Sequence, residues 1–473
     1  MNSGRDRLAL GGLALIVAAV TAIGVGVRAT QGAQTTADEP QYLLSALSLW
    51  EDADLDISDE LADERYRDFH EADLPQQTLL LEDGRRISPH DPLLPLLLAA
   101  PMGIGGWVAA KLAMAAMGGA LAALLAWTMV TRLHVSRTTA FVTAGIAALG
   151  PPLAVYSTQV YPEIPAAIAL LAGFAAVLGP FETRGRLALV IAVIALPWLA
   201  VKFVPVAAVL AAAGLVRAGN GRRAPMLTVL VTVGVVYLIG HLLIYGGVTA
   251  YAAGDHFVGG EFTAVGSKVS LWGRSTRLLG LLVDRGFGIG AWQPAYLILP
   301  FIFGWAASRR GPGLTTATWL LGTGWVVATF VALTMHGWWF PGRQLVVVLP
   351  IAAVIAAAWL DGARSWQRNL VFAGGLLGVV AFTFLLVDGL REELTWVVDF
   401  GTTTNPFYQS LASGMPNYVE LTTTTLLLHG VWIVVALSLL WMGWRAGRVQ
   451  AATKRRSAAN SPTPTLLPPT ETV

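Results

Sequence analysis

Long apolar segments recur along most of this 473-residue chain, and no other feature of the sequence constrains the fold as strongly. Many of them reach the roughly 20 residues that a helix needs to cross a lipid bilayer. The composition agrees, because 55% of the residues are hydrophobic and only 13% are charged. There is no cysteine, which excludes disulfides and cysteine-ligated metal sites. We therefore expect an all-α polytopic membrane protein that contacts the lipid bilayer and no nucleic acid.

The apolar segments predict about 12 membrane spans, within a range of about 11 to 13. The first is interpreted as an uncleaved span, because it is long for a signal peptide and no convincing cleavage site precedes Asp38. The predicted spans lie near residues 8–28, 107–130, 138–156, 162–179, 187–201, 203–216, 225–246, 292–307, 314–334, 344–360, 369–387 and 424–443.

The charged residues predict the orientation of these spans. Of the 31 lysines and arginines, 18 fall in short segments on the side of the N-terminus, whereas 25 of the 29 acidic residues fall on the opposite side. By the positive-inside rule, both termini are cytoplasmic and the acidic side is extracytoplasmic. We expect one domain, 1–456, in the plasma membrane, with long outer loops at 29–106, 247–291 and 388–423. The tail, 457–473, is rich in proline and threonine and is predicted to be disordered and cytoplasmic.

Two apolar segments do not fit a simple span. Residues 92–106 are too short to cross, so they are expected to lie along the outer interface or to dip in and return. Residues 187–217 are flanked by cytoplasmic arginines, so they must cross twice, with arms of about 15 residues or about 22 Å each. Because the hydrocarbon core of a bilayer is about 30 Å thick, the turn between the arms, at Lys202, should lie below the outer membrane surface. Lys202 either extends to the interface or lines a cationic pocket for a lipid phosphate.

Adjacent carboxylates, Asp38 and Glu39, follow the first span on the outer side. Together with a buried cation and interfacial segments, they suit sugar transfer from a polyprenyl-phosphate carrier. A phosphate leaving group needs no proton, so this reaction requires one general base for the acceptor hydroxyl and cations for the departing phosphate. A glycoside hydrolase would instead need two separated carboxylates. The pair also suits the start of a helix at Pro40, and that role is compatible with catalysis.

The stretch ADEPQYLLSALSLWEDADLDI resembles the first outer loop of the GT-C superfamily, the membrane glycosyltransferases that use polyprenyl-phosphate sugars. It is most similar to the branch related to protein O-mannosyltransferases and the lipid A aminoarabinose transferase. Further similarities follow in the family's order: HDPLLPLLLAAPMGIGG, VYSTQVYPEIPAAIAL, LAVKFVP, LVDRGFGIGAWQPAYLILP and GWWFPGRQLVVVLP. The resemblance implies a GT-C-like transmembrane helix bundle with interfacial helices in its first outer loop. It also implies an inverting hexosyl- or pentosyltransferase.

The resemblance further implies site residues. Asp38 corresponds to the catalytic base and Glu39 to its partner, which orients the acceptor or a divalent cation. If a metal binds, these two residues are its expected ligands. Lys202 and Arg343 correspond to contacts with the donor phosphate, although WWFPGR lacks the family's Gly-Gly-x-Ser run. The other candidates for substrate contact are His90, Tyr161, Glu163, Arg285 and His336.

Several of these candidates also have structural interpretations. Arg343 suits an interfacial anchor, Glu163 suits stabilisation of a helix N-terminus, and Arg285 suits a local pair with its neighbour Asp284. His90 and His336 lie at span ends, where a histidine is more often a structural residue of the interface.

Two further segments carry expectations of their own. The acidic residues Asp52, Asp54 and Asp56 favour a solvated loop, because the glycine and the distant glutamate of a calcium loop are missing. The segment 269–282 has leucine and tryptophan on one side and arginines spaced for the other. It is predicted to form one interfacial amphipathic helix.

A transporter or lipid flippase is the main alternative function, because about 12 spans would suit one. Transporters usually show paired broken helices in two repeated halves, whereas this sequence shows one such hairpin without a second copy. A non-catalytic scaffold that keeps the same fold is a third hypothesis. The sequence leaves open the sugar and the acceptor, which is a glycan, a lipid or a protein.

Overall fold

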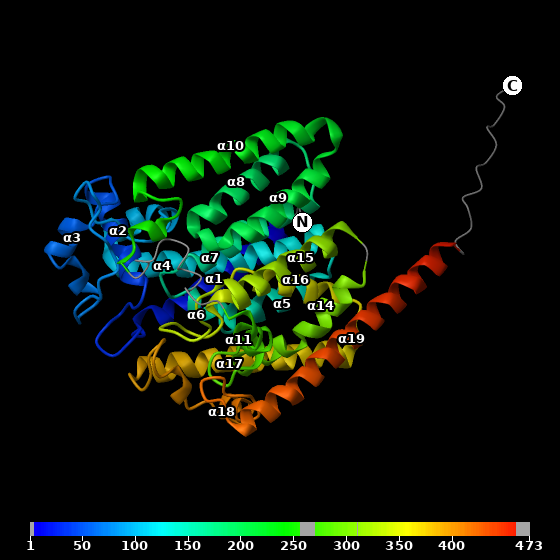
Figure 1. Cartoon of the computed structure of the whole chain (residues 1–473). Coiled ribbons are helices and arrows are strands. Elements are labelled where there is room, and N and C mark those ends of the chain that lie inside the picture. The colour runs from blue at the N-terminus through cyan, green and yellow to red at the C-terminus, as the bar shows by residue number, and fades with distance from the viewer. Residues whose placement is uncertain (1–3, 256–269, 310, 460–473) are drawn as a thin grey trace.

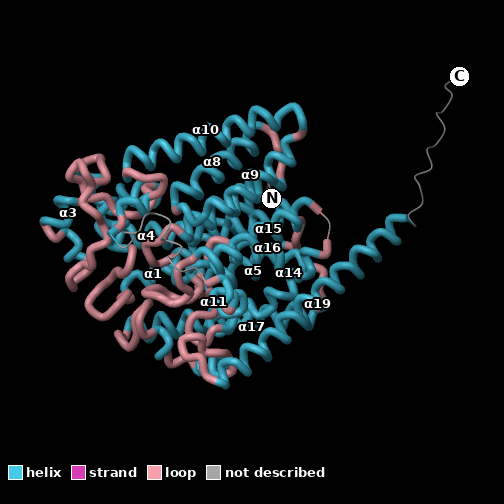
Figure 2. The backbone as a smooth tube through the Cα atoms, in the orientation of Figure 1, coloured by secondary structure: helices cyan, strands magenta, loops and turns pink. Residues whose placement is uncertain are grey.

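The computed structural model describes residues 4–255, 270–309 and 311–459. Over these residues the chain forms helices and isolated β-bridges but no β-strand, which confirms the predicted all-α fold. The long helices form a bundle, and most of the irregular segments gather toward one end of it (Figure 2).

The first half of the chain contains the first long loop and ten helices. Within that loop, α2, α3 and the 3-10 turn Arg65–Asp68 form a small helical layer at one end of the bundle (Figure 1). The helices are α1 (Gly4–Ile23), α2 (Glu39–Glu51), α3 (Ser58–Ala62), α4 (Leu93–Arg132), α5 (Arg137–Leu149), α6 (Leu153–Tyr156), α7 (Glu163–Leu178), α8 (Thr183–Leu199), α9 (Val204–Ala218) and α10 (Asn220–Tyr245).

The second half alternates short helices with long ones. Its helices are α11 (Leu271–Ser275), α12 (Arg277–Val283), α13 (Ile289–Trp292), α14 (Leu299–Ala307), α15 (Pro312–Val326), α16 (Leu349–Leu360), α17 (Ser365–Leu390), α18 (Pro406–Ser413) and α19 (Thr423–Ala459). The last helix extends through Ala459, so the predicted start of the tail at 457 falls inside it. Residues 460–473, the rest of that predicted tail, lie outside the described residues.

Seven helical segments among the described residues are long and apolar enough to cross a membrane. Two of them, which contain α10 and α19, have only 11% and 6% of their most apolar stretch buried inside the protein. Both lie at the periphery of the bundle (Figure 1). Because side chains this apolar need apolar surroundings, the chain is a multi-pass membrane protein.

Each of the 12 predicted spans contains a helix, but three are interrupted. The predicted span 138–156 breaks after Leu149, where Gly150 and two prolines end α5. The segment 292–307 begins with the 3-10 turn Pro294–Ile298, and the helical part of 344–360 begins only at Leu349. Proline lacks the amide hydrogen that a helix interior requires, so these breaks follow from the sequence. The exact number of spans stays a prediction.

The two unusual apolar segments each change direction, and their position relative to the membrane stays a prediction. Residues 93–104 form the first part of α4, which kinks at Gly105 and Gly106 before the spanning part begins. The kink needs glycine, because Gly106 has φ +64°. Helices α8 and α9 form the predicted hairpin, and its turn is the 3-10 segment Val201–Phe203, which contains Lys202.

The prediction of one amphipathic helix over 269–282 is wrong, and residue 269 itself lies outside the described residues. Residues 271–283 form two short helices, α11 and α12, and the second buries its leucines. Arg274 donates to the carbonyl of Phe330, and Arg277 donates to those of Ala332 and Leu333. The two arginines therefore bind carbonyl groups at the end of the π-helical segment Val327–Val331, which continues α15. Hydrophobic periodicity does not predict these hydrogen bonds from the arginines to backbone carbonyls.

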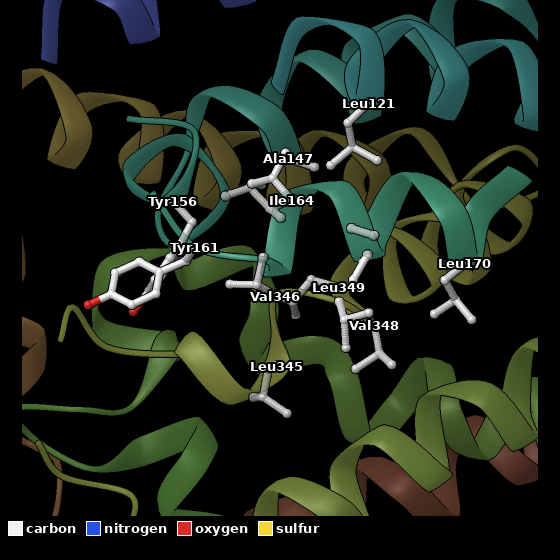
Figure 3. Packing of buried hydrophobic residues seen from close by; sticks show 14 of the residues in the cluster. Leu121, Ala147, Tyr156, Tyr161, Ile164, Leu170, Leu345, Val346, Val348 and Leu349 are labelled. Atoms are coloured by element: carbon white, nitrogen blue, oxygen red, sulfur yellow. The ribbon is translucent and has the colours of Figure 1, made fainter. Parts of the chain in front are cut away.

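The core near the loop end holds two distant segments together. Ile164 of α7 lies beside Val346 and Leu349, and Leu170 lies toward Val348, where the chain leads into α16 (Figure 3). These side chains are fully buried. Their packing fixes the start of α7 against the turn before α16. Glu163 begins α7 and Arg343 lies in that turn, so the packing brings a carboxylate close to a guanidinium.

Candidate active site

Four charged side chains from four separate segments meet at the loop end of the bundle. Arg343 Nη2 lies 2.5 Å from Asp38 Oδ2, and Arg343 Nε lies 3.0 Å from Glu163 Oε1. Lys202 Nζ donates to the same Glu163 oxygen at 2.7 Å. Two carboxylates and two cations thus form one connected cluster without formal net charge. Pairing of this kind is what allows charges to be buried.

Arg343 lies at the centre of the cluster because of the turn that precedes it. Gly342 has φ +83°, and a Cβ atom at this position would come within 2.5 Å of Ile289 Cγ2, so only glycine fits. The Arg343 guanidinium lies 4.0 Å from the Tyr161 ring centre and 5.3 Å from that of Trp339. The aromatic faces favour the cation and restrict its position.

Asp38 occupies the N-terminal end of α2, directly after Ala37, whose φ of +53° is unusual for a residue with a side chain. Its side chain keeps 26% of its surface exposed, and His90 Nε2 lies 3.9 Å from Asp38 Oδ1. His90 is held in place by stacking on Tyr42, at 4.6 Å between ring centres. Burial raises the pKa of Asp38, but the charges of Arg343 and His90 outweigh this effect and hold that pKa well below its usual range.

Glu39 lies in a different environment from its neighbour. Its residue is fully buried, and its two carboxylate oxygens accept from the backbone amides of Val160, at 2.7 Å, and Thr36, at 3.1 Å. Burial raises the pKa of Glu39, while Lys111 and the two amides act in the opposite direction. Glu39 therefore joins the first long loop to the segment before α7.

We expect Glu39→Gln to destabilise the protein rather than to stop its chemistry. A glutamine keeps one acceptor oxygen but turns an amide donor toward the second backbone N–H, which costs about 1–3 kcal/mol. Thermal unfolding of the purified variant would show a lower midpoint, with kcat of the folded protein within a few-fold of wild type. Unchanged stability with a large loss of kcat would instead place Glu39 in the reaction.

Other polar residues hold the same region and were missed in the sequence. Asp91 Oδ1 lies 2.8 Å from His241 Nε2 and accepts from Tyr237 at 3.3 Å. Asp91 Oδ2 accepts from the amide of Val201, the residue before Lys202. The sequence does contain a pattern that indicates this polar contact. Tyr237, His241 and Tyr245 recur every four residues in the apolar α10 and so share one face.

Lys111 is a second residue that sequence reasoning missed. It is fully buried in α4, and its Nζ donates to the carbonyl of Gln34 at 2.6 Å. It lies near enough to Glu39 to act on the charge of that carboxylate. Its position within an apolar helix could have identified it, because a lysine in such a helix is rare unless it is paired.

Arg285 and His336 contact another part of the protein. Arg285 donates to the carbonyls of Met415 and Ser413, while His336 Nε2 lies 3.5 Å from Asp284 Oδ2. Asp284 also accepts from three backbone amides and so organises this turn. The structure thus brings together Asp38, His90, Tyr161, Glu163, Lys202 and Arg343 from the predicted set and places Arg285 and His336 around Asp284.

The geometry fits a divalent cation between Asp38 and Glu39 poorly. Asp38 already pairs with Arg343, which shares Glu163 with Lys202, and both oxygens of Glu39 accept from backbone amides. A dication would have to enter beside two fixed positive charges. The same cations suit an anionic ligand such as a phosphate.

No protein-family model matches this sequence, and no curated protein matches it significantly. Several solved structures match by fold, among them two of ArnT. The crystal structure of ArnT from Cupriavidus metallidurans bound to undecaprenyl phosphate has a TM-score of 0.50 and 14% identity, over 98% of this chain and 82% of that one. The apo structure of the same protein has a TM-score of 0.52 and 16% identity, over 92% of this chain and 75% of that one. The chain therefore has the fold of these ArnT structures.

Proposed function

We propose that this protein is an inverting glycosyltransferase that moves a sugar from a polyprenyl-phosphate carrier to an acceptor hydroxyl on the extracytoplasmic face of the membrane. The observation that carries the proposal is the position of Arg343, whose guanidinium contacts both Asp38 and Glu163 beside Lys202. A phosphate held by these cations would lie next to a partly exposed carboxylate. The ArnT structure with undecaprenyl phosphate supports a donor of this class.

In the proposed reaction, Asp38 accepts the proton of the acceptor hydroxyl while the oxygen attacks the anomeric carbon. The bond between that carbon and the phosphate oxygen breaks, and polyprenyl phosphate leaves with the bonding electrons. Attack on the face opposite the leaving group inverts the carbon. The phosphate gains negative charge as it leaves, so Lys202 and Arg343 stabilise the transition state more than the bound donor.

Donor binding would also activate the base. In the free protein, Arg343 pairs with Asp38 and holds its pKa low, which makes Asp38 a weak base. A donor phosphate competes for the same guanidinium, weakens that pair and makes Asp38 more basic. The base would then act only when the sugar donor is present, which limits unproductive chemistry.

Glu163 and His90 have supporting roles in this proposal. Glu163 Oε1 holds Lys202 and Arg343 together against their mutual repulsion. Its Oε2 is buried and accepts no hydrogen bond from the described residues. His90 lies on the other side of Asp38 and orients the carboxylate. The interpretation of Lys202 as an interfacial residue is less well supported, because its ammonium group is paired inside the cluster.

The experiment that tests the function compares a deletion strain with the same strain expressing the wild-type chain. Polyprenyl-phosphate sugars and envelope glycans, lipids and proteins are profiled by mass spectrometry. We expect the deletion to accumulate one polyprenyl-phosphate sugar and to lack one sugar decoration, both restored by the wild type. Purified protein should then form the product with an anomeric configuration opposite to that of the donor. A flippase would give no product from purified protein and a soluble acceptor.

A further inference from the structure

The first outer loop contains acidic residues that the proposed reaction does not use. Two of them hold turns. Asp54 Oδ1 accepts from the hydroxyl of Ser48 at 2.9 Å, and Asp56 Oδ1 accepts from Ser58 and from the amide of Arg86. This part of the loop is therefore more ordered than the solvated loop predicted from its sequence.

Three other acidic residues, Asp52, Asp59 and Glu60, face one another. One carboxylate oxygen from each lies within 4.8 Å of the other two. Asp52 directly follows the last residue of α2, and Asp59 and Glu60 lie in the first turn of α3. Asp52 and Asp59 are exposed, whereas Glu60 is buried. Like charges at such distances repel one another, so the cluster needs compensation.

Glu60 is the residue that points to a ligand. It is only 2% exposed, and neither of its carboxylate oxygens accepts a hydrogen bond from the described residues. A buried carboxylate without donors is rare, because burial removes the water that would otherwise stabilise it. The neighbouring arginine, Arg65, is bound at both terminal nitrogens by Glu51. Glu60 is thus directed at Asp52 and Asp59 with unused acceptor capacity.

We propose that Asp52, Asp59 and Glu60 bind a hard divalent cation, Ca²⁺, between the end of α2 and the start of α3. The ligands are all oxygens, as Ca²⁺ prefers, whereas Zn²⁺ favours nitrogen and sulfur. Ca²⁺ takes oxygen ligands at about 2.3–2.6 Å in flexible geometry, so it can be shared by three oxygens that lie within 4.8 Å of one another. Mg²⁺ demands near-ideal octahedral geometry at about 2.0–2.1 Å, which suits ligands from two separate helices less well.

This site is separate from the charged cluster at Asp38. Helix α2 has 13 residues, with Asp38 at its N-terminal end and Asp52 at its C-terminal end, so the two sites lie about 20 Å apart. The cation would touch no reacting atom. It would join α2 to α3 and so stabilise the loop that presents Asp38.

The test uses the full chain in detergent, first treated with EGTA and then titrated with Ca²⁺, Mg²⁺ or the luminescent probe Tb³⁺. We expect Ca²⁺ to raise the midpoint of thermal unfolding with a Kd of about 10⁻⁴–10⁻³ M, and to displace Tb³⁺. Glu60→Gln should weaken Ca²⁺ binding at least about tenfold. Asp63→Asn, at an exposed position just after α3, removes the same charge outside the site and should leave the binding unchanged.

The competing arrangement is a protonated Glu60 that shares a hydrogen bond with Asp59, since burial and this neighbour raise the pKa of Glu60 to about 8 without a cation. In that case Ca²⁺ would shift neither unfolding nor Tb³⁺ emission at millimolar concentration, and the proposal would be overturned. Wild-type affinity in Glu60→Gln would overturn it as well. If that variant does not fold, Asp52→Asn at an exposed position serves instead, and undiminished affinity there has the same meaning.

Discussion

Asp38→Asn is expected to lower kcat by about 10²–10⁴, the contribution that a positioned general base typically makes. An asparagine has nearly the same shape but accepts no proton at neutral pH. Binding of the donor should be retained or become tighter, because Arg343 loses the carboxylate that competes with the phosphate. Transfer from a synthetic polyprenyl-phosphate sugar gives kcat, and titration of polyprenyl phosphate gives the affinity.

The matched control is Asp68→Asn, an exposed aspartate of the same loop, which should transfer sugar at the wild-type rate. The variants are compared at equal thermal stability, so that a loss of folding is not counted as a loss of chemistry. Wild-type kcat in Asp38→Asn would show that another group removes the proton. Lost donor binding would show that Asp38 positions the phosphate instead.

Arg343→Lys is expected to have the second-largest effect, a decrease of about 10²–10³ in kcat/KM. A lysine keeps the charge, but its single ammonium group cannot contact Asp38 and Glu163 in the forked geometry of a guanidinium. It also loses the flat contact with the Tyr161 ring. Both the donor KM and kcat should change, since the cation binds the phosphate and stabilises its departure.

Two comparisons give this result its meaning. Arg391→Lys changes an exposed arginine just after α17 and should leave the kinetics unchanged. Arg285→Lys tests the other predicted arginine, which donates to the carbonyls of Met415 and Ser413, and should have a much smaller effect than Arg343→Lys. If Arg285→Lys costs as much activity as Arg343→Lys, the donor phosphate binds at the Asp284 turn and the proposed site is wrong.

The sequence determined the class of fold, because apolar segments of membrane-spanning length leave few other choices. The prolines and glycines also indicated where helices break, as at Gly150 and at the kink of Gly106. Local chemistry likewise pointed to Asp38, Lys202 and Arg343, since charged residues at the ends of apolar segments need partners or a function. It placed Arg285 and His336 in the same set, because their spacing along the chain carries no information about distance.

Which of these residues meet depends on how the helices pack. Asp38 and Arg343 are 305 positions apart, and a contact between them depends on the packing of α7 against the segment before α16. The fold also gives Asp38 and Glu39 different partners, although their adjacent carboxylates suggested a pair in the sequence. One faces a guanidinium and the other accepts backbone amides. Neighbours at the start of a helix point in different directions, so their partners are fixed by the surrounding fold and not by the chain between them.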